Sequence, residues 1–130
     1  MEFHSIKSKE DILHFLEKTN SLHDGYIIGV EYTNEAITNV DENGYFINPY
    51  AKKVVLRILV TSICDTVVEI QFNGTLEWQI KEDNTGMTST SVILNDKNLV
   101  VWSDDTFIGM DELKNGSYVI ANSMEWRIVK

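Results

Sequence analysis

Proline and cysteine are nearly missing from this sequence, with one residue of each among 130. A single cysteine cannot form a disulfide within the chain, which excludes the disulfide-rich class of small secreted domains. The longest apolar run is far shorter than the roughly 20 residues that span a bilayer, and the first residues lack the basic and apolar stretches of a signal peptide. We therefore expect a cytoplasmic protein without a membrane-spanning segment.

Positive charge is scarce as well. The chain has 11 Lys and Arg residues against 20 Asp and Glu residues, which gives a net charge of −9. Such a surface repels the phosphates of DNA and RNA, so we expect no nucleic-acid partner. The spacings of metal ligands, phosphate-binding glycine loops and nucleophile motifs do not occur either, and we expect neither a metal nor a cofactor.

The sequence does contain enough apolar residues for one core. Hydrophobic residues make up 43% of the chain, and a chain of this length buries roughly two thirds of its unfolded surface. An N-terminal helix is predicted over residues 8–18, because Ser8 can cap its first turn and apolar residues follow at helical spacing. Glu10 and Asp11 place negative charge where the helix dipole favours it. No helical period follows residue 18.

The rest of the chain has the period of β-strands. The alternating apolar residues from Tyr26 to Tyr32 predict a strand with one buried face. The apolar run over residues 54–61 predicts a central strand that is covered on both faces. Asn73 and Gly74, flanked on both sides by alternating runs, predict a tight hairpin.

Further strands are predicted at residues 87–94, 99–103, 117–121 and 124–129. Short connections cannot join parallel strands, so the sheet should be antiparallel. The predicted fold is mainly β (α+β): a single domain over residues 1–130, with an antiparallel sheet of about six to eight strands, strongly bent or sandwich-like, and one N-terminal helix. The predicted core comprises Ile12, Leu16, Ile28, Val30, Leu56, Ile58, Val68, Ile70, Phe72, Trp78, Leu99, Val101, Trp126 and Ile128.

Two long stretches, residues 34–51 and 104–115, fit no regular element, and loops of that length often carry function. Acidic residues concentrate there: residues 21–48 contain five acids and residues 104–112 contain four, without any Lys or Arg. These acids either serve solubility alone or meet a basic protein, with nearby aromatic residues supplying affinity. The candidate partner-binding residues are Asp41, Glu42, Tyr45, Phe46, Trp102, Asp104, Asp105, Phe107, Asp111 and Glu112.

His23 and Asp24 stand side by side at the entry to the first predicted strand. Side chains of neighbouring residues in an extended chain point to opposite sides, so we expect a structural motif here and no catalytic pair. In that role Asp24 accepts backbone N–H groups and His23 donates to a nearby carbonyl. Residues 41–44 predict a turn. Cys64 has no basic neighbour and is expected to be a buried or half-buried thiol.

Six segments carry a resemblance to a known pattern. They are Leu22-His23-Asp24-Gly25-Tyr26-Ile27, Glu31-Tyr32, Leu56-Arg57-Ile58, Val68-Glu69-Ile70-Gln71-Phe72-Asn73-Gly74, Val101-Trp102-Ser103-Asp104 and Met124-Glu125-Trp126-Arg127. In order and spacing they resemble a family of small uncharacterised bacterial proteins, whose first strand opens with an aromatic residue or Leu followed by His-Asp-Ser. The resemblance covers residues 22–127, with Gly25 in place of the usual Ser. It implies no activity, but size, acidity and architecture are similar to those of bacterial immunity proteins, which bind and neutralise a toxin.

The sequence is compatible with three functions. The first is a non-enzymatic, immunity-like module that binds a basic protein. The second is a small-ligand or carbohydrate-binding β domain that uses Tyr26, Tyr32 and the tryptophans. The third is an enzyme that uses His23 and Asp24, which requires their side chains to converge in a cleft. The oligomeric state stays open, because an exposed edge strand can pair with a second copy.

Overall fold

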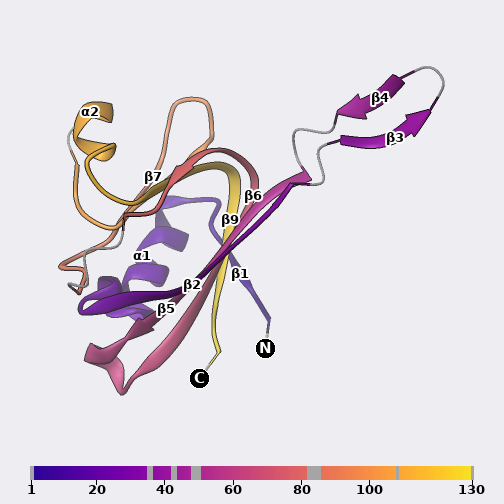
Figure 1. The fold of residues 1–130 in the computed structure, drawn as a ribbon. Helices are drawn as coiled ribbons and strands as arrows, with labels where there is room; N and C mark the ends of the chain where they lie inside the picture. Colours follow the sequence, from indigo (N-terminus) through magenta and orange to yellow (C-terminus); the bar gives the residue numbers. More distant parts are fainter. Residues whose placement is uncertain are drawn as a thin grey trace.

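In the computed structural model, seven strands form one twisted sheet in the order β2-β5-β6-β9-β8-β7, with β1 paired to β9 (Figure 1). The structure describes residues 2–34, 37–41, 44–47, 51–81, 86–107 and 109–129. All pairs of strands in the described part are antiparallel. The predicted fold class, mainly β with an N-terminal helix, is confirmed.

The strands of the sheet and the elements outside it have the following bounds. The strands of the sheet are β1 His4–Ser5, β2 Gly25–Asn34, β5 Lys52–Val60, β6 Thr66–Gln79, β7 Ser91–Leu94, β8 Val100–Ser103 and β9 Tyr118–Ile128. The other elements are the helices α1 Lys9–Lys18 and α2 Met110–Leu113, the hairpin strands β3 Ile37–Asp41 and β4 Gly44–Ile47, and the 3-10 turns η1 Asn20–Leu22 and η3 Thr61–Ile63. Among the described residues, no helix is long and apolar enough to cross a membrane.

Helix α1 begins where the sequence predicts it. The Ser8 hydroxyl accepts a hydrogen bond from the Asp11 N–H at 3.2 Å, and the Asp11 carboxylate accepts one from the Lys7 N–H at 2.8 Å. These bonds satisfy backbone donors that have no partner within the helix. The bond from Lys7 lowers the pKa of Asp11 below its ordinary value. The apolar side of the helix buries Ile12 and Phe15.

The larger of the two apolar clusters lies on one face of the sheet. In β5 the side chains of Val54, Leu56, Ile58 and Val60 are completely buried, whereas Arg57, between them on the other face, is exposed. The prediction that residues 54–61 form a strand covered on both faces is therefore wrong. A central strand needs only one buried face when the second face of an antiparallel sheet meets water.

Strand β2 is an edge strand, and within the described residues it pairs only with β5. A β-bulge shifts the register between Ile27 and Gly29. Ile28 is 57% exposed and Val30 is 42% exposed, so their assignment to the core is wrong, as is the predicted buried face from Tyr26 onward. Alternation separates two faces of a strand, but it does not reveal whether another element covers either one.

Strand β6 runs straight through the predicted hairpin at Asn73 and Gly74. It is a single strand of 14 residues, and it pairs with the equally continuous β9. Gly74 is left-handed, with φ of +64°, but a tight hairpin of this type needs two consecutive residues with positive φ. The chain instead bulges after Thr75. A Cβ at residue 74 would lie 2.5 Å from Nδ2 of Asn122, so glycine permits the close approach of β9.

Both stretches that fit no regular element contain short elements. Strands β3 and β4 pair Ile37 with Ile47 and form a separate two-stranded sheet, which extends away beyond the ends of β2 and β5 (Figure 1). Asp41 pairs with Gly44 across the end of this hairpin, where the sequence predicts a turn. In the second stretch, α2 interrupts the loop between β8 and β9. The prediction that no helix follows residue 18 is thus wrong, because α2 forms one helical turn.

Candidate functional site

A cavity of about 400 Å³ lies beside α2. Its walls come from residues 86–88, from residues 103–106 after β8, and from residues 112, 113, 115 and 116. Three carboxylate residues face it: Asp104, Asp105 and Glu112. The described lining residues include no Lys or Arg. We call this cavity the acidic cleft, and it unites three of the residues that the sequence predicts to bind a partner.

Backbone contacts hold the two aspartates in the turn that follows β8. The Asp104 N–H donates to the Ser117 carbonyl at 3.0 Å, and the Asp105 N–H donates to the hydroxyl of the buried Ser103 at 3.2 Å. The Asp105 carboxylate then accepts the N–H of Thr106 at 2.7 Å. Such local bonds from a short carboxylate to the following backbone fix a turn. These hydrogen bonds hold the backbone of the turn that carries the two carboxylates.

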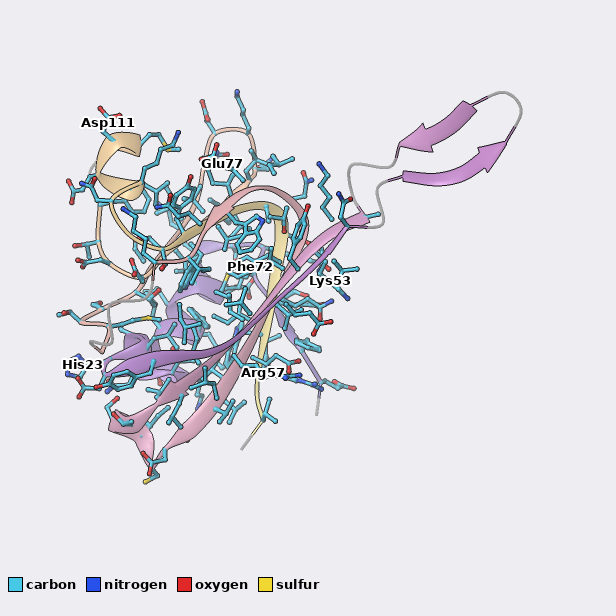
Figure 2. All side chains as sticks on the ribbon, in the orientation of Figure 1. His23, Lys53, Arg57, Phe72, Glu77 and Asp111 are labelled. Carbon is cyan, nitrogen blue, oxygen red and sulfur yellow. The ribbon has the colours of Figure 1, made fainter. Side chains whose placement is uncertain are left out.

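Helix α2 supplies the third carboxylate. Leu113 is buried with Val101 and Tyr118 in a small apolar cluster, and this anchor leaves Asp111 and Glu112 exposed. Figure 2 shows Asp111 on the outer side of α2. Asp111 is not among the residues that line the acidic cleft. Of the two acids of α2, only Glu112 lines the acidic cleft.

The two aromatic candidates near the cleft are not freely accessible. Trp102 is completely buried, with its ring centroid 6.0 Å from that of Phe72, so its side chain is closed to a partner. Trp102 stands on β8, whose four residues are all buried. Phe107 is half-buried against the apolar cluster under α2. The aromatic contribution that the sequence suggests for this surface is thus reduced to the exposed part of Phe107.

The remaining partner-binding candidates lie elsewhere. Asp41, Tyr45 and Phe46 belong to the β3–β4 hairpin, for which the structure describes the backbone, and Glu42 lies outside the described residues. In Figure 1 this hairpin and α2 stand well apart, on opposite sides of the view. The candidate partner-binding residues therefore belong to two separate parts of the molecule, the β3–β4 hairpin and the region around α2.

His23 and Asp24 converge, in contrast to the sequence prediction. Nε2 of His23 lies 3.6 Å from Oδ2 of Asp24, and both side chains are about half exposed. The reason is that Asp24 is left-handed, with φ of +57°, so the chain is not extended there. Nδ1 of His23 lies 2.7 Å from the Thr88 carbonyl oxygen. A carbonyl oxygen only accepts, so a hydrogen bond between these two atoms requires the proton on Nδ1.

Three loops meet around this pair. The Ser62 hydroxyl donates to the His23 carbonyl at 2.6 Å and the Thr61 hydroxyl donates to the Asp24 carbonyl at 3.0 Å. From the third loop, Met87 accepts the Asp24 N–H at 2.8 Å. Because Thr88 lines the acidic cleft and its carbonyl holds His23, the pair stands at the edge of the cleft. The engagement of residues 86–88 here also explains why β7 begins only at Ser91, later than predicted.

The single cysteine lies on the surface just after β5. Cys64 is exposed, contrary to the prediction of a buried or half-buried thiol, because η3 and a left-handed residue carry the chain outward after β5. The part of the chain that the structure describes contains no group of three or more His, Cys, Asp or Glu side chains that could hold a metal ion. Sequence reasoning missed Thr88 and Gly116, whose roles depend on distant segments and leave no local signal.

A comparison with protein-family models, with curated proteins and with solved structures found no match to this chain. The resemblance to a bacterial family, and the immunity-like role suggested by analogy, therefore stay predictions. What the chain binds has to be inferred from the acidic cleft and from the neighbouring His23 and Asp24.

Proposed function

We propose that this chain is a non-enzymatic protein-binding module that takes a basic partner into the acidic cleft. The observation that carries this proposal is the convergence of Asp104, Asp105 and Glu112 on one cavity without a described Lys or Arg in its lining. Carboxylates that share a recess concentrate negative potential and attract a Lys or Arg side chain. The net charge of −9 adds attraction at longer range.

Two lysines close to the cleft in sequence have partners within the chain. The Lys114 ammonium lies 3.6 Å from the Glu77 carboxylate on β6, and the Lys81 ammonium donates to the Asn115 carbonyl at 3.4 Å. Size, acidity and mainly β architecture fit an immunity-like role in the cytoplasm, in which the module binds a basic toxin and blocks it.

Capture from host lysate tests this proposal with three versions of the tagged protein: wild type, Asp105→Asn/Glu112→Gln, and the control Glu17→Gln/Asp65→Asn. Each double variant removes two charges from exposed residues, but only the first changes the cleft. We expect one basic protein to bind wild type and control, to be lost from the cleft variant, and to dissociate at high salt. Equal retention by both double variants would show that the acids serve solubility alone.

A second candidate function, acid–base catalysis by His23, is favoured by the convergence of His23 and Asp24. With Nδ1 of His23 on the Thr88 carbonyl, Nε2 is the ring nitrogen that is left to act as a base, and it lies 3.6 Å from Oδ2 of Asp24. A cationic substrate would suit the neighbouring cleft. Faster hydrolysis of a chromogenic lysine ester by wild type than by His23→Gln supports this function, whereas equal rates contradict it.

A further inference from the structure

A second cavity, of about 460 Å³, lies among β1, α1 and β9, away from the residues that line the acidic cleft. Its surface is mainly apolar, and its volume lies within the roughly 300–1,000 Å³ of small-molecule sites. We call it the aromatic groove. The residues that matter here are Glu2, His4, His14, Lys18, Trp126 and Arg127.

Three rings form the wall of the aromatic groove. Cross-strand pairing sets His4 opposite Trp126, with ring centroids 4.6 Å apart, and α1 brings His14 to 5.7 Å from the same indole. The two imidazoles lie 5.5 Å apart at an angle of 66°. Trp126 is only 2% exposed, whereas both imidazoles are exposed. The imidazoles are therefore the ring surfaces that a ligand can reach.

The charges of the groove favour an anion. Lys18 stands in the last turn of α1, and no carboxylate in the described part of the chain lies within ion-pair distance of it. Arg127 adds a second cation, held by Glu69 at 3.0 Å and placed over the Phe3 ring at 4.5 Å. Glu2 is the one acidic residue of the described lining. The formal charges of the described lining residues thus sum to +1, in a chain with a net charge of −9.

We propose that the aromatic groove binds a small aromatic carboxylate, with its ring against His4 and His14 and its carboxylate on the Lys18 ammonium. An apolar wall with a few placed charges is typical of small-molecule sites. Offset or edge contacts between aromatic rings add to the burial of the ligand ring. A neutral aromatic compound lacks the contact with Lys18, and an aromatic cation is repelled by Lys18 and Arg127. The site is independent of the acidic cleft.

Ligand titration of the full-length, isotope-labelled protein followed by NMR tests the proposal. The probes are indole-3-carboxylate, neutral indole and tryptamine, which share one ring system and differ in charge. We expect saturable shifts of the His4 and His14 imidazole signals with indole-3-carboxylate, weaker ones with indole and none with tryptamine. Lys18→Gln should weaken carboxylate binding roughly tenfold and leave indole binding unchanged, because it removes one charge-assisted hydrogen bond.

Lys9→Gln is the matched control, since Lys9 lies on the same helix and does not line the groove. Retained carboxylate binding by this variant, together with the loss in Lys18→Gln, supports the proposal. Equal affinity for indole and indole-3-carboxylate, or an equal loss in both lysine variants, overturns the assigned role of Lys18. The absence of shifts at His4 and His14 overturns the site itself.

Discussion

The carboxylate of Asp104 lies so close to the Cα of Gly116 that a Cβ at residue 116 would stand 2.6 Å from Oδ1. The missing side chain at residue 116 thus gives this carboxylate its place in the acidic cleft. We expect Gly116→Ala to displace the carboxylate and to weaken partner capture, but to lower the free energy of unfolding by no more than about 1 kcal/mol, because only the end of the Asp104 side chain has to shift. Urea unfolding and lysate capture measure the two effects.

Gly109→Ala is the control for this substitution. Nothing lies within 4 Å of a Cβ at residue 109, and its φ of −142° suits any residue. We expect its free energy of unfolding to change by no more than about 0.5 kcal/mol, with capture of the partner intact. If Gly109→Ala and Gly116→Ala behave alike, the close approach of Asp104 to Gly116 has no consequence for binding.

Glu69 is shared by two arginines on the open face of the sheet. Arg57, Glu69 and Arg127 stand opposite one another on three neighbouring strands, and the Glu69 oxygens lie 3.1 Å from Nε of Arg57 and 3.0 Å from Nη2 of Arg127. The Glu69 side chain is only 8% exposed. Glu69→Gln leaves both guanidinium groups without their counter-charge, and we expect the free energy of unfolding to fall by about 1–3 kcal/mol. The solvent around the exposed Arg57 keeps the loss below that of a fully buried pair.

The matched variant for this prediction is Glu125→Gln, which makes the same change on β9 at a half-buried residue. Its free energy of unfolding should stay within about 0.5 kcal/mol of wild type. Urea unfolding of both variants at two salt concentrations makes the comparison. A loss of the same size in both would show that the two arginines gain nothing from Glu69 in particular.

Tyr118 links the apolar cluster under α2 to β6. Its hydroxyl donates to Oε2 of Glu77 at 2.5 Å, and this bond, helped by burial, raises the pKa of Tyr118 from 10.0 to about 12. The folded state therefore holds the phenolic proton more tightly than the unfolded state does. The resulting stabilisation is complete below pH 10 and is lost as the pH rises from 10 to about 12. We expect stability to fall more steeply over that range in wild type than in Tyr118→Phe.

The variant Glu77→Gln distinguishes the two causes of the raised pKa of Tyr118, the hydrogen bond to Glu77 and burial. Because the bond to the Glu77 carboxylate is the largest cause of the shift, this variant should return the pKa of Tyr118 toward 10.0 while the ring stays buried. An ultraviolet absorbance titration, read as the difference from Tyr118→Phe, measures it. An unchanged pKa in Glu77→Gln would assign the shift to burial alone.

The features that the sequence predicted well are local ones. Ser8 caps α1 because the capping residue and the backbone donor that it satisfies are three positions apart. Antiparallel pairing follows from connections too short for a crossover. The concentration of acids in residues 104–112 also pointed to the region of the acidic cleft. Charged side chains are costly to bury in a core, so a run of acids indicates a segment on the surface.

The features that it missed depend on segments far apart in the chain. The exposure of Ile28 and Val30 follows from the edge position of β2, which no local pattern encodes. The convergence of His23 and Asp24 requires a left-handed aspartate, which three contacting loops hold in place. A glycine after an asparagine is compatible both with a hairpin turn and with an irregular position inside a strand. Here β6 continues past Gly74, because Asn122 on β9 lies close to the position that a side chain would occupy.

Cys64 offers a direct test of backbone strain at the site where η3 ends. Its φ of +57° and ψ of +44° are left-handed, and a side chain in this conformation costs roughly 1–2 kcal/mol. We expect Cys64→Gly to raise the free energy of unfolding by about 0.5–1 kcal/mol, since the greater chain entropy of glycine in the unfolded state offsets part of the relief. Cys64→Ala removes the exposed thiol but keeps the Cβ, so its stability should match wild type. Urea unfolding under reducing conditions compares the three proteins, and a glycine variant no more stable than the alanine variant would mean that the loop relieves the strain in another way.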